Sequence, residues 1–165
     1  LPNMTTRILF VCMGNICRSP VAEGMFNQLA TQAGRAHEFE VDSAGTGGWH
    51  EGELADPRSR AVARKHGLTL NRRARQIERA DFNRFDLIIA MDRENVSDLL
   101  SFSSLTPEQR AKVKLLREFD PKANGNLDVP DPYYGGPDGF ERMYEMIERS
   151  ARELLKSLPP ENSNQ

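Results

Sequence analysis

The strongest constraint on the fold is an apolar strand that leads directly into a short polar loop and then into a helix. Residues 8–11 read ILFV, and residues 12–20 read CMGNICRSP. Ser19 is a good N-cap and proline is favoured at the first helical position, so the sequence predicts a helix that begins at Pro20. The free N–H groups at the start of such a helix, together with the loop amides, bind anions. The chain is therefore expected to hold a negatively charged group where the strand ends.

The same loop carries a nucleophile and a cation. Five residues separate Cys12 from Arg18, which lets the loop curl until the thiol and the guanidinium face one small volume. The amides, the helix dipole and Arg18 all favour a thiolate at Cys12, and a thiolate is a nucleophile without a separate base. Arg18 offers a planar fork for two phosphate oxygens, and Gly14 lets the backbone approach closely. This combination indicates attack on phosphorus.

The segment resembles the signature loop, Cys-x5-Arg-Ser, of the low-molecular-weight protein tyrosine phosphatases of the bacterial, tyrosine-directed type. The resemblance covers nearly the whole chain, because residues 131–135, DPYYG, are similar to the acid loop of that family. It implies a three-layer α/β fold, in which helices flank both faces of a four-stranded parallel sheet of order 2-1-3-4. It also implies hydrolysis of phosphotyrosine in proteins, and of small aryl phosphates, through a phosphocysteine intermediate. This chemistry uses no cofactor and no metal.

The resemblance also implies the roles of single residues. Cys12 is the expected nucleophile, Arg18 the expected clamp on the phosphoryl oxygens, and Asp131 the expected general acid and then base. An isolated Asp-Pro pair is more typical of a turn, but the upstream loop favours the catalytic role of Asp131. The expected phosphate-binding residues are Met13, Gly14, Asn15, Ile16, Cys17, Arg18 and Ser19.

A second group of residues is implied to support the loop or to line the substrate cleft. The expected supports are Asn15, Ser19, Ser43, His66 and Asp92. From the residues themselves, His66 is better explained as a cation at a helix C-terminus, and Asp92 suits either an ion pair with Arg18 or a helix N-cap. The expected cleft residues are Met13, Ile16, Trp49, Tyr133 and Tyr134. Trp49 would alternatively only pack onto the glycines that precede it.

The chain has only two cysteines, Cys12 and Cys17, and both lie in the loop. A framework of structural disulfides is therefore excluded, and a reducing compartment suits the chain. A reversible disulfide between the two would protect the nucleophile from over-oxidation. The alternative is that Cys17 is a small packed residue.

The rest of the chain alternates strands with helices. Further strands are expected at residues 37–43, 86–92 and 113–116, and residues 130–139 are expected to form a loop. Helices are expected at residues 20–34, 57–66 and 140–158, within 75–85, after Asp92 and from Thr106. Parallel sheets bind ligands at the carboxyl ends of their strands, where Cys12, Ser43 and Asp92 lie. The helix after Asp56 is expected to bury residues 61–63.

Length and composition indicate one soluble domain. The chain has 165 residues, 38% of them hydrophobic, and a net charge of −2, which does not indicate a nucleic-acid-binding protein. No apolar run approaches the length of a membrane span and no signal pattern is present, so a cytoplasmic location is expected. Residues 4–158 are interpreted as a single phosphatase domain, residues 1–3 as a leftover of the expression vector and residues 159–165 as a frayed tail.

Several partners and alternatives follow from this interpretation. The expected partners are a tyrosine-phosphorylated protein, a cognate tyrosine kinase and inhibitory phosphate or other oxyanions, with no nucleic acid and no membrane. A monomer is expected, with a weak dimer as the alternative. An arsenate reductase of the same fold would need cysteines after Cys17, and a protein-arginine phosphatase resembles the chain but carries Thr in place of Ile16. A non-catalytic phosphate-binding module would have no need of Asp131.

Overall fold

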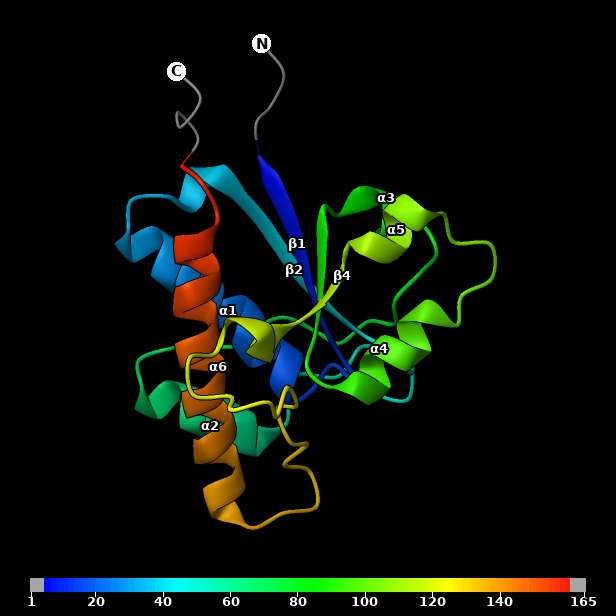
Figure 1. Cartoon of the computed structure of the whole chain (residues 1–165). Coiled ribbons are helices and arrows are strands. Elements are labelled where there is room, and N and C mark those ends of the chain that lie inside the picture. The colour runs from blue at the N-terminus through cyan, green and yellow to red at the C-terminus, as the bar shows by residue number, and fades with distance from the viewer. Residues whose placement is uncertain (1–4, 161–165) are drawn as a thin grey trace.

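A four-stranded parallel sheet forms the centre of the molecule, in a computed structural model that describes residues 5–160 (Figure 1). Its strands lie in the order β2-β1-β3-β4, which confirms the predicted order. They are β1 (Thr6–Cys12), β2 (Phe39–Gly45), β3 (Leu87–Ala90) and β4 (Val113–Leu115). The predictions for residues 1–3 and for the last five residues of the tail lie outside the described residues, and the single domain stays a prediction.

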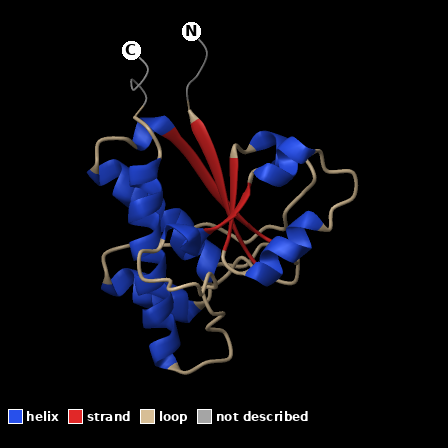
Figure 2. Ribbon diagram, in the orientation of Figure 1, coloured by secondary structure: helices blue, strands red, loops and turns tan. Residues whose placement is uncertain are grey.

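Helices cover both faces of the sheet (Figure 2). On one side lie α1 (Arg18–Gln32), α2 (Pro57–Lys65) and α6 (Pro137–Ser157), and on the other lie α3 (Asp81–Arg84), α4 (Arg93–Leu100) and α5 (Pro107–Ala111). Two short 3-10 helices, η1 (Ala36–Glu38) and η2 (Leu116–Phe119), complete the elements. Within residues 5–160, no helix has the length and hydropathy needed to cross a bilayer.

The central strand β1 divides the core into two layers. Ile8 and Phe10 are fully buried and pack in the cluster formed with α1 and α6. Leu9 and Val11 are equally buried but belong to the opposite cluster, which includes Leu99 of α4. This division follows from the alternation of side chains along a strand. Burial on both faces fixes β1 in the middle of the sheet and places Cys12 at the centre of its carboxyl edge.

The strand register brings the candidate residues to one edge of the sheet. Cys12 pairs with Gly45 and Phe10 with Ser43, while β3 ends beside Val11 and is followed by Asp92 after one residue. The prediction that these residues lie at the carboxyl ends of strands is confirmed for Cys12, the last residue of β1, and for Asp92, two residues after β3, whereas Ser43 lies two residues before the end of β2. The loop after Cys12 lies so close to β2 that a Cβ atom on Gly45 would come within 2.8 Å of a loop carbonyl oxygen.

Two helix boundaries, one strand and one buried face differ from the prediction. Strand β2 covers Phe39–Gly45 instead of residues 37–43, because the chain forms η1 up to Glu38. Helix α1 begins at Arg18, with Cys17 as an N-cap that makes no side-chain hydrogen bond, so Ser19 is not the cap. Pro20 is still tolerated, because the N–H groups of the first turn have no partner within the helix. Helix α6 begins at Pro137, inside the predicted loop. In α2, residues 62 and 63 are buried as expected, but residue 61 is exposed.

Candidate active site

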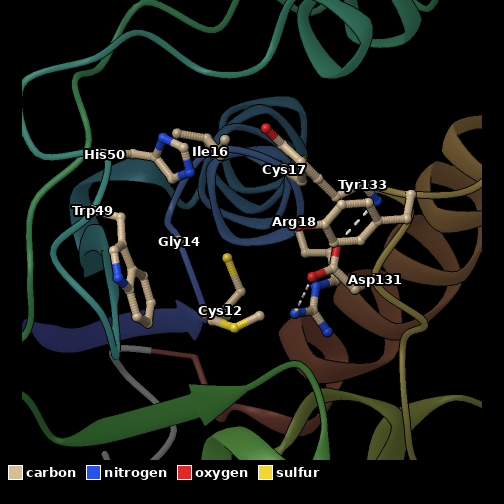
Figure 3. A pocket seen from close by; sticks show the side chains of 11 residues that line it. Cys12, Gly14, Ile16, Cys17, Arg18, Trp49, His50, Asp131 and Tyr133 are labelled. Carbon is tan, nitrogen blue, oxygen red and sulfur yellow. Dashed lines mark hydrogen bonds and ion pairs between the residues drawn. The ribbon is translucent and has the colours of Figure 1, made fainter.

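A cavity of about 310 Å³ opens at the carboxyl edge of the sheet. Figure 3 places Trp49 and His50 on one side of Cys12, and Asp131 and Tyr133 on the other. The predicted residues that line the cavity are Cys12, Met13, Gly14, Ile16, Cys17, Arg18, Trp49, Asp131, Tyr133 and Tyr134. His50 lines it as well, and sequence reasoning missed this residue because it belongs to none of the motifs that identified the site.

Cys12 lies at the floor of the cavity and is only 2% exposed. Its Sγ atom is 3.0 Å from the hydroxyl oxygen of Ser19 and accepts a hydrogen bond from the Ser19 backbone N–H at 3.4 Å. The Asn15 side-chain amide donates to the same hydroxyl oxygen at 2.8 Å. Because that oxygen already accepts a bond, its own hydrogen is available for the sulfur. Two donors from Ser19 therefore stabilise negative charge on Cys12.

The shape of the loop is fixed by a buried network that begins at Asn15. The Asn15 amide also donates to the Ser43 hydroxyl at 3.0 Å, which in turn donates to Glu23 at 2.7 Å. The Asn15 carbonyl oxygen accepts from the backbone N–H of Arg75 at 2.9 Å. Asn15 has a φ of 57°, in the left-handed region that asparagine adopts more readily than most residues. Two segments distant in the sequence, at Ser43 and Arg75, thus hold one strained residue in place.

Glu23 is part of this network, although sequence reasoning did not find it. It lies on the buried face of α1 and is 5% exposed. Burial raises the pKa of its carboxyl, while the hydrogen bond from Ser43 and the charge of Arg72 act in the opposite direction. A glutamate among the apolar positions of a predicted helix was the available signal, because a buried carboxylate needs partners.

His66, the fourth expected support, lies outside the network. Its Nε2 atom is 2.8 Å from a Glu141 carboxylate oxygen, and its ring stacks on Tyr144 with the centroids 4.3 Å apart. It is the C-cap residue of α2, so the structure agrees with the helix C-terminal position that the residues themselves favoured. The bond to His66 lowers the pKa of Glu141.

Arg18 is 1% exposed, and its guanidinium is held by two acceptors. Its Nη1 atom donates to Asp92 at 2.6 Å and to the carbonyl oxygen of Val129 at 2.9 Å. The other oxygen of Asp92 accepts from the backbone N–H of Asn95 at 2.7 Å and caps α4, so both alternatives for Asp92 are confirmed. The Nε atom of Arg18 is buried and has no partner among the described residues.

The charge of Arg18 is secured by its surroundings. Burial acts to lower the pKa of the guanidinium, but the charges of Cys12, Asp92 and Asp131 outweigh it and the pKa is raised. Nε has no protein acceptor and Nη2 has only the Asp131 oxygen at 3.5 Å, so this edge is the part of the guanidinium left for two oxygens of a bound anion. Cys17 differs, because burial and then the charge of Asp56 raise its pKa to about 12. Cys17 therefore keeps its proton at neutral pH.

Asp131 lies beside Arg18 at the opposite wall. One of its carboxylate oxygens accepts from the backbone N–H of Tyr133 at 3.0 Å. The other is 3.5 Å from Nη2 of Arg18. With a third of its side chain exposed, Asp131 lies at the boundary between the cavity and solvent. A carboxyl group in this position can exchange a proton with a bound molecule.

Aromatic rings form the rim of the cavity. Trp49 is 72% exposed, yet its ring covers Gly47 so closely that any side chain there would overlap it. The two alternatives for Trp49 therefore coexist, since it packs on the glycines and lines the cavity. The rings of His50 and Tyr133 are 6.3 Å apart, and Tyr134, 93% exposed, contacts Tyr133 edge-on. Within the described chain, no group of three His, Cys, Asp or Glu residues has the arrangement of a metal site.

Residues 7–164 match the family described as low molecular weight phosphotyrosine protein phosphatase. A low molecular weight protein-tyrosine-phosphatase of Streptomyces coelicolor is 52% identical over 158 residues, which cover 94% of each chain. A protein tyrosine phosphatase structure from Entamoeba histolytica, with Hepes in the active site, has a TM-score of 0.87 and 35% identity over 93% of this chain and 96% of its own. A drosophila arginine phosphatase structure has a TM-score of 0.83 and 35% identity over 91% and 96%.

Proposed function

Because this chain belongs to the low molecular weight phosphotyrosine protein phosphatase family, we propose that its cavity hydrolyses phosphotyrosine by the two-step route that follows. Cys12 attacks the phosphorus atom, and a sulfur–phosphorus bond forms as the bond to the phenolic oxygen breaks. Asp131 gives its proton to that oxygen as it leaves. Water then attacks the phosphocysteine while Asp131 takes up a proton, and inorganic phosphate and the thiolate are released.

The single observation that carries this proposal is the unpartnered Nε atom of Arg18. A buried guanidinium nitrogen without an acceptor is costly, and Arg18 lines the same cavity as Cys12. A phosphoryl group bound over Cys12 would supply the missing oxygens, and the same contact strengthens as charge develops in the transition state. The backbone amides of the loop from Met13 to Ser19 are proposed to bind the remaining oxygens.

The aromatic rim supports an aryl ester as the substrate. Met13, Ile16, Trp49, Tyr133 and Tyr134 are the proposed walls around the phenyl ring, with His50 added from the structure. Tyrosine-phosphorylated proteins are the proposed partners, and inorganic phosphate and other oxyanions the proposed inhibitors. The cognate kinase, the monomeric state with weak dimerisation and the cytoplasmic location stay predictions.

A protective disulfide with Cys17 also stays a prediction. Both cysteines line one cavity and are free, which favours it. The raised pKa of Cys17 opposes it, since a protonated thiol attacks an oxidised partner slowly.

The experiment that tests the function compares turnover of phosphotyrosine, phosphoarginine and phosphoserine in peptides of one sequence. We expect phosphotyrosine to be cleaved fastest and vanadate to block the reaction, because the cavity combines an anion clamp with aromatic walls. Faster cleavage of phosphoarginine would favour the activity named for the drosophila relative. Binding of all three peptides without turnover would favour a phosphate-binding module.

A further inference from the structure

We propose that Arg58 is a positioning residue that holds the Asp131 carboxyl ready for proton transfer, acting through the main chain of Tyr133. The proposal rests on the proposed role of Asp131 as the proton donor. Arg58 lies in the first turn of α2 and reaches across to the acid loop, which we define as residues 131–135.

A short relay joins the guanidinium to the carboxylate. Arg58 Nη1 donates to the carbonyl oxygen of Tyr133 at 3.0 Å. The N–H of Tyr133 donates to Asp131 Oδ1, also at 3.0 Å. The carbonyl oxygen of Tyr133 is thereby held by the Arg58 side chain, and the N–H of Tyr133 by the Asp131 side chain. Oδ1 accepts this bond, whereas Oδ2 accepts no hydrogen bond within residues 5–160 and lies 3.5 Å from Nη2 of Arg18, so Oδ2 is the oxygen proposed to carry the proton toward a leaving group.

Arg58 also fixes the ring of Tyr133. The guanidinium carbon lies 5.3 Å from the centroid of the Tyr133 ring and 4.6 Å from that of Phe140, a buried residue of α6. A guanidinium at such distances is attracted to the faces of aromatic rings. The Arg58 side chain thus contacts both the main chain and the ring of Tyr133, and it also packs on the buried ring of Phe140.

Arg58 is itself held by Asp56, which is hydrogen-bonded to the loop that carries the nucleophile. The Arg58 fork binds Asp56 through Nε and Nη2, each at 3.0 Å from a different carboxylate oxygen. Asp56 is buried, and its backbone N–H donates to the carbonyl oxygen of Ile16 at 2.8 Å. Asp56 and Arg58 therefore connect the acid loop to the loop that carries the nucleophile, in addition to the direct ion pair between Arg18 and Asp131.

Apart from the ion pair between Asp131 and Arg18 at 3.5 Å, the acid loop has little other polar support. Pro132 is buried and provides packing, and its carbonyl oxygen accepts from Gly135 within the loop. Between residues 5 and 160, the bond from Arg58 is the one hydrogen bond that reaches residues 131–135 from outside the loop. Loss of Arg58 should therefore release the main chain of Tyr133 and loosen the Asp131 carboxyl, which keeps the ion pair with Arg18 as its contact outside the loop.

The test uses esters whose leaving groups need protonation to different degrees. We expect Arg58→Met to lower kcat/KM for phenyl phosphate about tenfold and to change that for nitrophenyl phosphate by less than about twofold. Arg58→Lys keeps a cation near both rings, so it should show the same pattern with a smaller loss and serves if Arg58→Met fails to fold. The matched control is Arg60→Met in the same helix, because Arg60 donates to Ala55 and not to the acid loop. It should leave both rates within about twofold.

A double-mutant cycle separates positioning from a structural role. In an Asp131→Ala background, Arg58→Met should cause no further loss with phenyl phosphate, because the proton donor is already absent. An equal loss with both esters, or the same loss in the Asp131→Ala background, would overturn the inference and leave the proposed function intact. If Asp131→Ala itself did not slow phenyl phosphate hydrolysis, the proposed function would fail first, so the two failures are distinguishable.

Discussion

The phosphate loop, residues 12–19, and the acid loop face each other across one cavity but are held in opposite ways. In the phosphate loop, Cys12, Asn15, Arg18 and Ser19 are each at most 3% exposed, and their polar atoms bond to β2, to α1 and to distant loops. In the acid loop, a third of the Asp131 side chain is exposed. The first loop is part of the core, whereas the second rests on the surface.

The difference matches what each loop does in the proposed reaction. Donors that stabilise a thiolate and a phosphoryl group act best when they are fixed beforehand, because they then need no reorganisation during the reaction. A loop that admits and releases an aryl group is drawn from the less stable parts of a structure. Changes in the phosphate loop should therefore cost stability as well as activity, and changes in the acid loop should cost activity alone.

The largest expected effect comes from Cys12→Ser. Turnover should fall at least about 10⁴-fold, because a hydroxyl at this position is not ionised at neutral pH. Phosphate binding should persist, since Arg18 and its supports remain. Nitrophenol release and calorimetric titration with phosphate measure the two quantities. Turnover close to that of the unaltered protein would exclude Cys12 as the nucleophile.

Asp131→Ala should lower kcat/KM for phosphotyrosine about 100-fold, because the leaving phenolate loses its proton donor. The free energy of unfolding should change by less than about 0.5 kcal/mol, as for other partly exposed side chains. Peptide hydrolysis and urea denaturation give the two values. A loss of stability of several kcal/mol would break the comparison, since the acid loop would then belong to the core.

Asn15→Ala should lower both stability and activity. Its removal takes away the donor to the Ser19 and Ser43 hydroxyls and the acceptor of the Arg75 backbone N–H, so the free energy of unfolding should fall by about 2–3 kcal/mol and turnover about tenfold. Asn27→Ala is the matched control, because Asn27 is exposed on α1. If Asn15→Ala were as stable as Asn27→Ala, the phosphate loop would not be held by its network.

The smallest expected effect is a change in pH dependence. Burial raises the pKa of Glu23 in the folded chain, so folding binds its proton more tightly and the stability from this group is lost as pH rises through that pKa. Glu23→Gln should remove this contribution while keeping an acceptor for Ser43. Urea denaturation at pH 5 and pH 7.5 should show that the free energy of unfolding falls more between these pH values in the unaltered protein than in Glu23→Gln. Equal falls in the two proteins would mean that Glu23 is as hydrated in the folded chain as in the unfolded chain.

Much of the fold follows from local patterns. The apolar runs predict the strands, and Asp56-Pro57 and Thr106-Pro107 predict helix starts that are found with their caps in place. The predicted start of α1 was wrong because the Ser19 hydroxyl is bonded to the Cys12 sulfur. That tertiary contact outweighs the preference of serine for capping a helix. A local rule fails here at the residue that the site uses.

The cavity was predicted less completely than the sheet. Loop motifs located Cys12, Arg18 and Asp131, but the contacts that support them join residues far apart in the chain. Val129 accepts from Arg18 across 111 positions, and Arg58 reaches Tyr133 across 75. Neither contact has a local signature. For His66 the local pattern was right about its position at a helix C-terminus, and the loop-support role implied by the resemblance was wrong, because its partner is Glu141 on α6.

The position of Trp49 has a practical consequence. It is the one tryptophan of the 165-residue sequence, and it stands largely in water at the mouth of the cavity. Its fluorescence should therefore respond to whatever enters, without any attached dye, even in variants that have lost all turnover. The chain carries its own optical reporter of occupancy.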